Sequence, residues 1–340
     1  MVAQKATIAM VAKHAGVSVA SVSRVINGTL ARPATEEKVR AAIAELGFQP
    51  NSAARALKVR ESEQICLSFA DIGNPAYLTI TQGINSVLRD TKYRLILSSS
   101  LGTADEIHNH LQSLGRGYAD GLIISPITST PEIAKAINSL TVPTVLIGTL
   151  PKDVLVDNVY IDSAKGIELA VAHLREIGCK KIALVNGPLS TNPGRRRHQG
   201  FVDAMNKVKL KYDDSSIYFA RDFTSQAATE LLEKDKTLHR YDAVLCTNDL
   251  LAAGVIRNLQ SRSVRVGEDI SVIGMDNTEL CTLLNPSLTS VDLRAERRGQ
   301  LAAELLLERI KNPLSAPRKI EVKPELVIRE STNMRAGTRK

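Results

Sequence analysis

The sequence predicts a small all-α head followed by a larger α/β body of two lobes, and three observations lead to this fold class. Residues 7–47 contain three short amphipathic helical patterns, each opened by a capping residue or closed by a glycine. From residue 64 onward, apolar strand-like runs alternate with longer helical patterns, which indicates parallel sheets covered on both faces. About 270 residues of this second pattern exceed one doubly wound unit, so we expect two lobes.

The head carries most of the net charge. The chain has 340 residues and a formal net charge of +8. Residues 1–60 hold nine lysines and arginines but three glutamates, so +6 of that charge lies in the head. A small basic module attached to a nearly neutral body indicates a polyanionic partner.

The first helical pattern of the head begins after Thr7, which can cap it. Gly16 can take the positive φ of a tight turn, and Ser18 can cap a second helix. A third helix is expected to open with Thr35 as its cap and to end at Gly47.

The second helix has two distinct faces. Val22, Val25 and Ile26 fall within one arc, which suits the core of a three-helix bundle. The opposite arc holds Val19, Ala20, Ser23, Arg24 and Asn27. A helix, a glycine turn, a helix and a supporting helix form the helix-turn-helix arrangement, whose second helix enters the DNA major groove. An ordinary three-helix bundle is the alternative, but it leaves the small residues of this arc unexplained.

The chemistry of that arc suits base edges. Arg24 can donate two hydrogen bonds to guanine O6 and N7, whereas Val19 and Ala20 offer apolar contact, for example to a thymine methyl group.

After the head, Asn51 can cap a helix of about two turns that is too short to be stable alone. Leu57, flanked by cations, fits a wedge into the minor groove. An unstructured linker is the alternative for this segment.

The strands expected in the body are apolar runs separated by helices such as residues 163–178 and 249–263. Their sequences are ICLSFA, RLILSSS, GLIIS, PTVLIG, KIALVNG, DAVLCTN and ISVIGMD. Ligands of open α/β sheets bind beyond the carboxyl ends of the strands, where polar and aromatic residues gather in this chain. These candidate ligand-binding residues are Asn74, Tyr77, Ser125, Arg197, Phe223, Asn248 and Asp276. Taken singly, each is as readily a helix cap or a surface residue.

The stretches ATIAMVAKHAGVSVASVSRVING and ATEEKVRAAIAELGFQPNSAARAL, with the body after them, resemble the LacI/GalR family of bacterial transcription regulators. The similarity covers nearly the whole chain. It implies that Val19, Ala20 and Arg24 occupy base-reading positions and that Leu57 is an intercalating hinge leucine. With the caps and neighbours, the expected DNA-binding residues are Thr7, Ser18, Val19, Ala20, Ser21, Ser23, Arg24, Asn27, Asn51, Ala54, Arg55, Leu57 and Lys58.

The resemblance also implies the organisation of the chain. It predicts a helix-turn-helix DNA-binding domain at 1–50, a hinge helix and linker at 51–63, and a periplasmic-binding-protein-like effector-binding and dimerisation domain at 64–335. The chain of that domain is expected to cross between lobes near 162, 291 and 323. Lobe 1 would then comprise about 64–162 and 292–322, and lobe 2 about 163–291 and 323–335.

For the effector, the resemblance assigns contacts to Arg197, Asn248 and Asp276, and a stacking role to Phe223, as in purine-responsive members. One departure is Gly148, where several relatives place an aspartate, so one common polar contact is missing. Another is the run of three arginines at 195–197. Arg197 is expected in the cleft. For Arg195 and Arg196 two placements stay open. Either they are solvated, or one of them faces the cleft, which would favour an anionic ligand.

The sequence thus predicts a homodimeric repressor that binds double-stranded operator DNA and responds to a small polar effector, sugar-like or nucleoside-like. A tail without leucine heptads predicts no tetramerising bundle. A solute-binding protein of a transport system is the alternative, disfavoured by the basic head and by the missing signal peptide. No catalytic or metal-binding motif is found, so we expect neither an enzyme nor a cofactor.

No apolar run is long enough to span a bilayer, and scattered cysteines indicate buried thiols, both consistent with the cytoplasm.

Overall fold

The computed structural model describes most of the chain and divides it into two compact units. The described residues are 6–26, 28–49, 61–99, 109, 111–113, 118–149, 154–235 and 237–332. The units are Met1–Ser62, the head, and Glu63–Lys340, the body. The predicted fold class is confirmed for both, while the predicted hinge helix lies outside the described residues.

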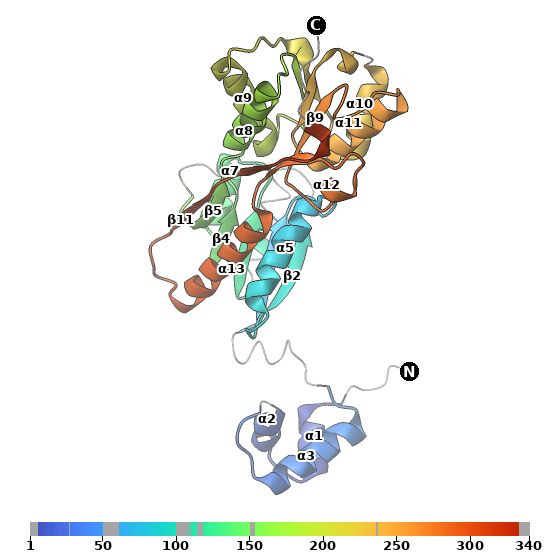
Figure 1. The fold of residues 1–340 in the computed structure, drawn as a ribbon. Coiled ribbons are helices and arrows are strands. Elements are labelled where there is room, and N and C mark those ends of the chain that lie inside the picture. The colour runs from blue at the N-terminus through green and yellow to red at the C-terminus, as the bar shows by residue number, and fades with distance from the viewer. Residues whose placement is uncertain are drawn as a thin grey trace. The chain divides into compact units, whose positions relative to one another are not determined.

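The head consists of three helices (Figure 1), which are α1 (Ile8–Ala15), α2 (Val19–Ile26) and α3 (Pro33–Leu46). Two predicted caps are confirmed. The Thr7 hydroxyl accepts the Met10 N–H at 3.3 Å, and the Ser18 hydroxyl accepts the Ser21 N–H at 3.1 Å. Gly16 has a φ of 66°, as the tight turn requires.

The expected cap of the third helix is wrong. Helix α3 starts two residues before Thr35, with Pro33 in its first turn and Arg32 at the N-cap without a side-chain hydrogen bond. Proline suits this place because the first N–H groups of a helix have no partner within it. The helices enclose one apolar core, formed by Val11, Ala12, Ala15, Val22, Val39 and Ala42.

The body contains two six-stranded sheets, called here sheet A and sheet B. Sheet A has the order β11-β5-β4-β3-β1-β2 and is parallel throughout. Its strands are β1 (Gln64–Phe69), β2 (Arg94–Ser99), β3 (Gly121–Ser125), β4 (Thr144–Ile147), β5 (Asp157–Ile161) and β11 (Lys319–Val322). Sheet B has the order β12-β10-β9-β8-β6-β7, and its edge strand β12 alone runs antiparallel to its neighbour. Its strands are β6 (Ile182–Asn186), β7 (Ile217–Phe219), β8 (Ala243–Cys246), β9 (Ser271–Met275), β10 (Thr289–Asp292) and β12 (Glu325–Val327).

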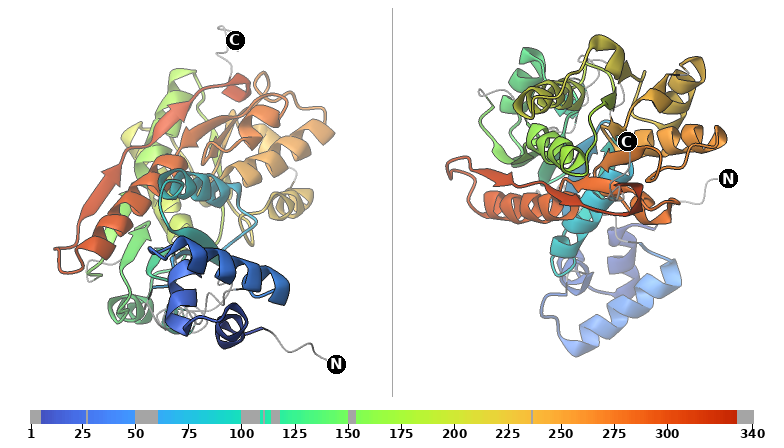
Figure 2. Two further views of the ribbon diagram at one scale, coloured as in Figure 1. Left: turned by 90° about the horizontal axis from the view of Figure 1, so that it is seen from below. Right: turned by 45° about the horizontal axis from the view of Figure 1, so that its top comes forward.

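Helices cover the sheets, as the continuous apolar strands require (Figure 2). The helices of the sheet A lobe are α5 (Pro75–Leu88), α7 (Pro131–Asn138) and α13 (Ala295–Lys311). Those of the sheet B lobe are α8 (Ser163–Glu176), α9 (Asn192–Lys207), α10 (Ser225–Lys234), α11 (Asp249–Ser261) and α12 (Leu280–Leu283). Short 3₁₀ turns lie at Asp214–Ser216, Leu238–Arg240 and Glu330–Thr332.

The chain passes between the lobes at three places. It leaves sheet A after β5, returns between β10 and α13, and leaves again between β11 and β12. Strands β11 and β12 are separated by two residues, Lys323 and Pro324, so one short segment joins both sheets. The ends of β3 and β4 in sheet A and of β9 in sheet B therefore lie near the same interlobe space.

Two glycines bring α5 and α13 into close contact in the sheet A lobe. A Cβ on Gly83 would lie 2.1 Å from the Glu296 carbonyl oxygen, and one on Gly299 would lie 2.2 Å from that of Ile80. No side chain fits at either position, so the two backbones touch. This contact fixes the start of α13 beside the middle of α5.

Candidate functional site

The first candidate surface is the exposed face of α2. Val22 is fully buried, whereas Val19 is 46% exposed and Ala20 and Arg24 are exposed beside it. The head therefore buries one arc of this helix and leaves the other uncovered, as the sequence predicts. Small side chains on this face allow a helix to approach a groove floor closely, and Arg24 extends a cation from it.

Most other expected DNA-binding residues flank this face or lie outside the described residues. Thr7 and Ser18 are exposed at the starts of α1 and α2, and Ser21 and Ser23 are half-buried on α2. Unpaired backbone N–H groups at helix starts favour phosphate oxygens. The remaining expected residues lie outside the described residues: Asn27, Asn51, Ala54, Arg55, Leu57 and Lys58.

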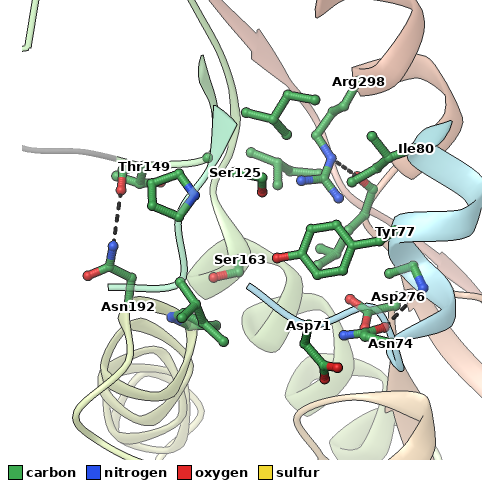
Figure 3. A pocket seen from close by; sticks show the side chains of 18 of the residues that line it. Asp71, Asn74, Tyr77, Ile80, Ser125, Thr149, Ser163, Asn192, Asp276 and Arg298 are labelled. Carbon is green, nitrogen blue, oxygen red and sulfur yellow. Dashed lines mark hydrogen bonds between the residues drawn. The ribbon is translucent and has the colours of Figure 1, made fainter. Parts of the chain in front are cut away.

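The second candidate site is a cavity of about 150 Å³ between the two lobes of the body (Figure 3). Six of the seven expected effector residues line it. From the sheet A lobe they are Asn74, Tyr77 and Ser125, and from the sheet B lobe Arg197, Phe223 and Asp276.

Strand ends bring these residues to the cavity. Ser125 is the last residue of β3, and Asn74 caps α5 after β1 by accepting the Ala76 N–H at 2.9 Å. Asp276 directly follows β9 with a φ of 110°, a conformation that side-chain-bearing residues rarely adopt. Such backbone strain is typical of functional positions. Here it accompanies a carboxylate that faces the cavity.

The two expected aromatic residues lie on opposite lobes. The Tyr77 ring stacks on Phe69, with 4.8 Å between the ring centroids, so its hydroxyl end faces the cavity (Figure 3). Burial raises the pKa of Tyr77 above its ordinary value. A Cβ on Gly187 would lie 2.4 Å from the ring of Phe223, so the glycine makes room for that ring. Both rings are thus positioned by packing before a ligand arrives.

Asn248 differs from the expectation of direct contact. It is 1% exposed and is absent from the cavity wall. Its side-chain oxygen accepts the Leu251 N–H at 2.8 Å, and its amide nitrogen donates to the Phe223 carbonyl at 2.9 Å. In this conformation Asn248 caps α11 and holds the segment that carries Phe223.

The three consecutive arginines of α9 point in different directions. Arg195 donates to the Leu189 and Ser190 carbonyl oxygens and to Asn192, on the outer side of the helix start. Arg196 lines the cavity and donates to Asp162 at 3.1 Å. Arg197 also lines it, and its guanidinium donates to the Thr247 carbonyl.

Arg197 and Asp276 form the charged centre of the sheet B side. Their nearest nitrogen and oxygen lie 3.7 Å apart, which is too long for a hydrogen bond. Burial raises the pKa of Asp276 from its ordinary value to about 7, although the nearby Arg197 opposes this rise. Burial also lowers the pKa of Arg197. Near neutral pH the cavity therefore holds a carboxyl group that can gain or lose its proton.

This raised pKa predicts a pH-dependent stability. The fold favours the neutral carboxyl, so its contribution is present below the unfolded pKa and is lost as the pH rises through about 7. Relative to Asp276→Asn, the free energy of unfolding of the wild type is expected to fall by about 2 to 3 kcal/mol between about pH 5 and about pH 8. Chemical denaturation at both pH values measures it. A difference between the two proteins that does not change with pH would contradict the prediction.

The structure adds cavity residues that the sequence did not single out. Arg298, in the first turn of α13, lines the cavity, as does Asn192 at the start of α9. The Asn192 N–H donates to the Ile127 carbonyl at 2.8 Å, and its side chain reaches the Thr149 carbonyl at 3.5 Å, so it links the lobes (Figure 3). Asn192 follows a predicted strand end, a signal that could have identified it. Nothing local marks Arg298.

Within the described ranges, no group of histidine, cysteine or acidic side chains could hold a metal ion. Among the helices described there, none combines the length and apolar character that crossing a membrane requires.

Two family profiles match the chain. Residues 7–51 match the profile described as bacterial regulatory proteins, lacI family. Residues 171–332 match a periplasmic binding protein-like domain. The first match covers the three-helix head, and the second covers much of the sheet B lobe and α13.

Full-length relatives agree with these matches. The chain is 34% identical to the HTH-type transcriptional repressor PurR of Vibrio atlanticus (strain LGP32) over 331 residues, which are 96% of this chain and 98% of that protein. It is 31% identical to the ribose operon repressor of Haemophilus influenzae, over 96% of this chain and 98% of the relative. Both relatives are named as repressors.

Solved structures show the same architecture. The lac repressor dimer bound to operator and the anti-inducer ONPF superposes with a TM-score of 0.83 at 26% identity, over 97% of this chain and all of that one. The transcriptional regulator CelR in complex with cellobiose gives 0.70 at 29% identity, over 96% and 100%. With its helix-turn-helix head and its two-lobed ligand-binding body, the chain belongs to the lacI family of bacterial regulatory proteins and is a DNA-binding transcriptional repressor.

Proposed function

We propose that this repressor binds a near-palindromic operator as a homodimer and that a small polar effector, sugar-like or nucleoside-like, changes its operator affinity. The observation that carries the DNA half is the uncovered face of α2, where Val19, Ala20 and Arg24 are exposed. One head reads one half-site, so two heads are needed for a palindrome. The proposed place of action is the cytoplasm, where the operator is found.

The chemistry of the residues predicts which of them contact bases and which contact phosphates. Arg24 makes the base-specific hydrogen bonds, while Val19 and Ala20 make apolar contacts in the major groove. Thr7 and Ser18, which cap the N-termini of α1 and α2, contribute phosphate contacts, and these orient the head without reading the DNA sequence. The hinge residues, Leu57 among them, are proposed to enter the minor groove.

The effector half rests on the cavity between the lobes. The wall combines aromatic rings, hydroxyl groups and charged groups, a composition that suits a polar ring. The contacts of Asn192 with Ile127 and Thr149 join the lobes across the cavity. A ligand that favours one arrangement of the lobes shifts the population of the DNA-binding form, in either direction.

Selection from a random pool of double-stranded DNA tests the first half. The purified protein is expected to enrich near-palindromic sequences, to bind one with two chains per site, and to lose affinity steeply as salt increases. Weak binding of equal strength to every sequence would overturn the DNA half of the proposal.

The second half is tested by adding sugars, nucleobases, nucleosides and their acidic derivatives to the selected complex. At least one compound that raises the melting temperature of the protein is expected to change its operator affinity about fivefold or more. Compounds that bind the protein but leave operator affinity unchanged would overturn the effector half alone.

A further inference from the structure

One buried cation in the cavity forms no ion pair within the described part of the chain, and its nearest opposite charges, Asp276 and Asp292, act on it only from a distance. Arg298 is 9% exposed and lines the cavity, with its Nε donating to the Leu293 carbonyl at 2.8 Å. Figure 3 shows its guanidinium pointing into the same space as Tyr77 and Ser125. Among the described residues, its two terminal nitrogens have no hydrogen-bond acceptor, and no carboxylate forms an ion pair with it.

Two other arginines of the body, the half-buried Arg309 and the buried Arg197, each lie close to a carboxylate. Arg309, on the same helix, places its Nε 2.9 Å from the fully buried carboxylate of Asp157. Arg197 lies 3.7 Å from Asp276. Burying a cation without a partner is costly, and a fold rarely keeps one without a use. Burial also lowers the pKa of Arg298, although an arginine stays protonated in proteins.

The whole cavity is cationic. Its wall carries three arginines, Arg196, Arg197 and Arg298, against two aspartates, Asp71 and Asp276. Arg196 is paired with Asp162 at 3.1 Å, which leaves Arg197 and Arg298 opposite Asp71 and Asp276. Asp276 carries only part of its negative charge near neutral pH, because burial raises its pKa to about 7. The wall therefore offers more positive than negative charge to a ligand.

The packing fixes Arg298 in this place. Its helix touches α5 through Gly83 and Gly299, so the first turn of α13 cannot move away from Tyr77 without separating the helices. The Nε hydrogen bond to Leu293 fixes the plane of the guanidinium. A donor held in position before binding loses little entropy when it meets an acceptor.

We infer that Arg298 is a specificity-determining residue of the cavity and that it binds an anionic group, a carboxylate or a phosphate, carried by the effector. The inference rests on the proposed function, since it names the chemical class of the proposed effector. A guanidinium with two free terminal nitrogens suits such a group, because it can donate two parallel, charge-assisted hydrogen bonds to two oxygens of a carboxylate or a phosphate. The Tyr77 and Ser125 hydroxyls beside it supply further donors.

Matched pairs of ligands test this inference by calorimetric titration and thermal shift. The pairs are adenosine with adenosine 5′-monophosphate, ribose with ribose 5-phosphate, and glucose with glucuronate. The anionic member of at least one pair is expected to bind about tenfold or more tightly than its neutral partner. The phosphate pairs and the carboxylate pair separate the two kinds of anion.

Variants identify the residue responsible. Arg298→Met is expected to weaken the anionic ligand by about tenfold to a hundredfold and to leave the neutral partner unchanged. Arg297→Met, which removes an exposed cation of the same helix outside the cavity, is expected to change neither. Equal binding of the anionic and neutral partners, or an unchanged affinity of Arg298→Met for the anion, would overturn the inference.

A second measurement needs no ligand. Arg298→Met is expected to raise the melting temperature of the ligand-free protein by about 2 °C or more, because it removes an unpaired buried charge. Arg309→Met is expected to lower it, since it leaves the Asp157 carboxylate unpaired. If Arg298→Met melted at a lower temperature than the ligand-free wild type, Arg298 would be a structural residue, and the inference would be wrong.

The proposed function and the inference fail in different ways. A neutral compound that binds and changes operator affinity, with Arg298→Met unaffected, leaves the proposed function standing and removes the inference. A panel in which no compound binds the wild type counts against both.

Discussion

Arg24→Ala is expected to lower specific operator affinity by roughly 30-fold to ten-thousandfold. A bidentate contact between arginine and guanine contributes about 1 to 3 kcal/mol of discrimination, and a dimer places two such contacts on the operator. Both contacts are lost in the variant, so the loss is about 2 to 6 kcal/mol. Because the Arg24 side chain is exposed on α2, the substitution leaves the core of the head intact. Fluorescence anisotropy with the selected operator and with an unrelated duplex measures the change.

Two comparisons make this test specific. Arg40→Ala removes an exposed cation of α3 that is paired with Glu36 at 2.6 Å, and it is expected to have little effect. Arg24→Lys keeps the charge but loses the bidentate geometry, so it should resemble the alanine variant on the operator. If Arg24→Ala weakened operator and unrelated duplex equally and reduced the salt dependence, Arg24 would be a phosphate contact and would not read bases.

Arg197→Leu is expected to lower effector affinity by about a hundredfold or more. The substitution removes a buried guanidinium of the cavity wall, which donates to the Thr247 carbonyl and lies 3.7 Å from Asp276. Hydrogen bonds to charged groups contribute about 1.5 to 3 kcal/mol each, and the guanidinium is expected to donate two of them to the effector. Titration of a ligand that binds the wild type measures the loss, and the operator affinity of the variant should no longer respond to that ligand.

Variants of the same helix control for a general disturbance of α9. Lys207→Leu, which removes an exposed cation paired with Glu168 at the far end of α9, is expected to bind the effector like the wild type. Arg197→Lys keeps a buried cation and is expected to fold even where the leucine variant is unstable. Wild-type affinity of both Arg197 variants would remove this residue from the effector site.

Local patterns in the sequence predicted the head and seven strands of the body, which are β1, β2, β3, β4, β6, β8 and β9. The caps at Thr7 and Ser18 and the positive φ of Gly16 depend on neighbouring residues alone, so they could be predicted without the tertiary structure. The error at Thr35 is also local, because a proline two positions earlier supplies an equally good helix start. The unpaired arc of α2 follows from helical periodicity in the same way.

The cavity was predicted only in part. Strand ends and the family resemblance indicated six residues that line it, since ligands of α/β sheets gather at those ends. The role of Asn248 depends on a hydrogen bond to the carbonyl of Phe223, a residue distant in sequence. No local pattern distinguishes such a support from a direct ligand contact.

The sequence by itself determined the three helices of the head, seven strands of the body, the basic charge of the head and the face of α2 that is left uncovered. These follow from short-range periodicity and capping. The tertiary structure alone decided which arginines have countercharges and which face the cavity. Arg298 meets Tyr77 because Gly83 and Gly299 bring two helices into contact across more than two hundred residues of chain. Charge pairing in a core depends on such long-range packing, because burial and distance, rather than residue type, determine the energy of a charge.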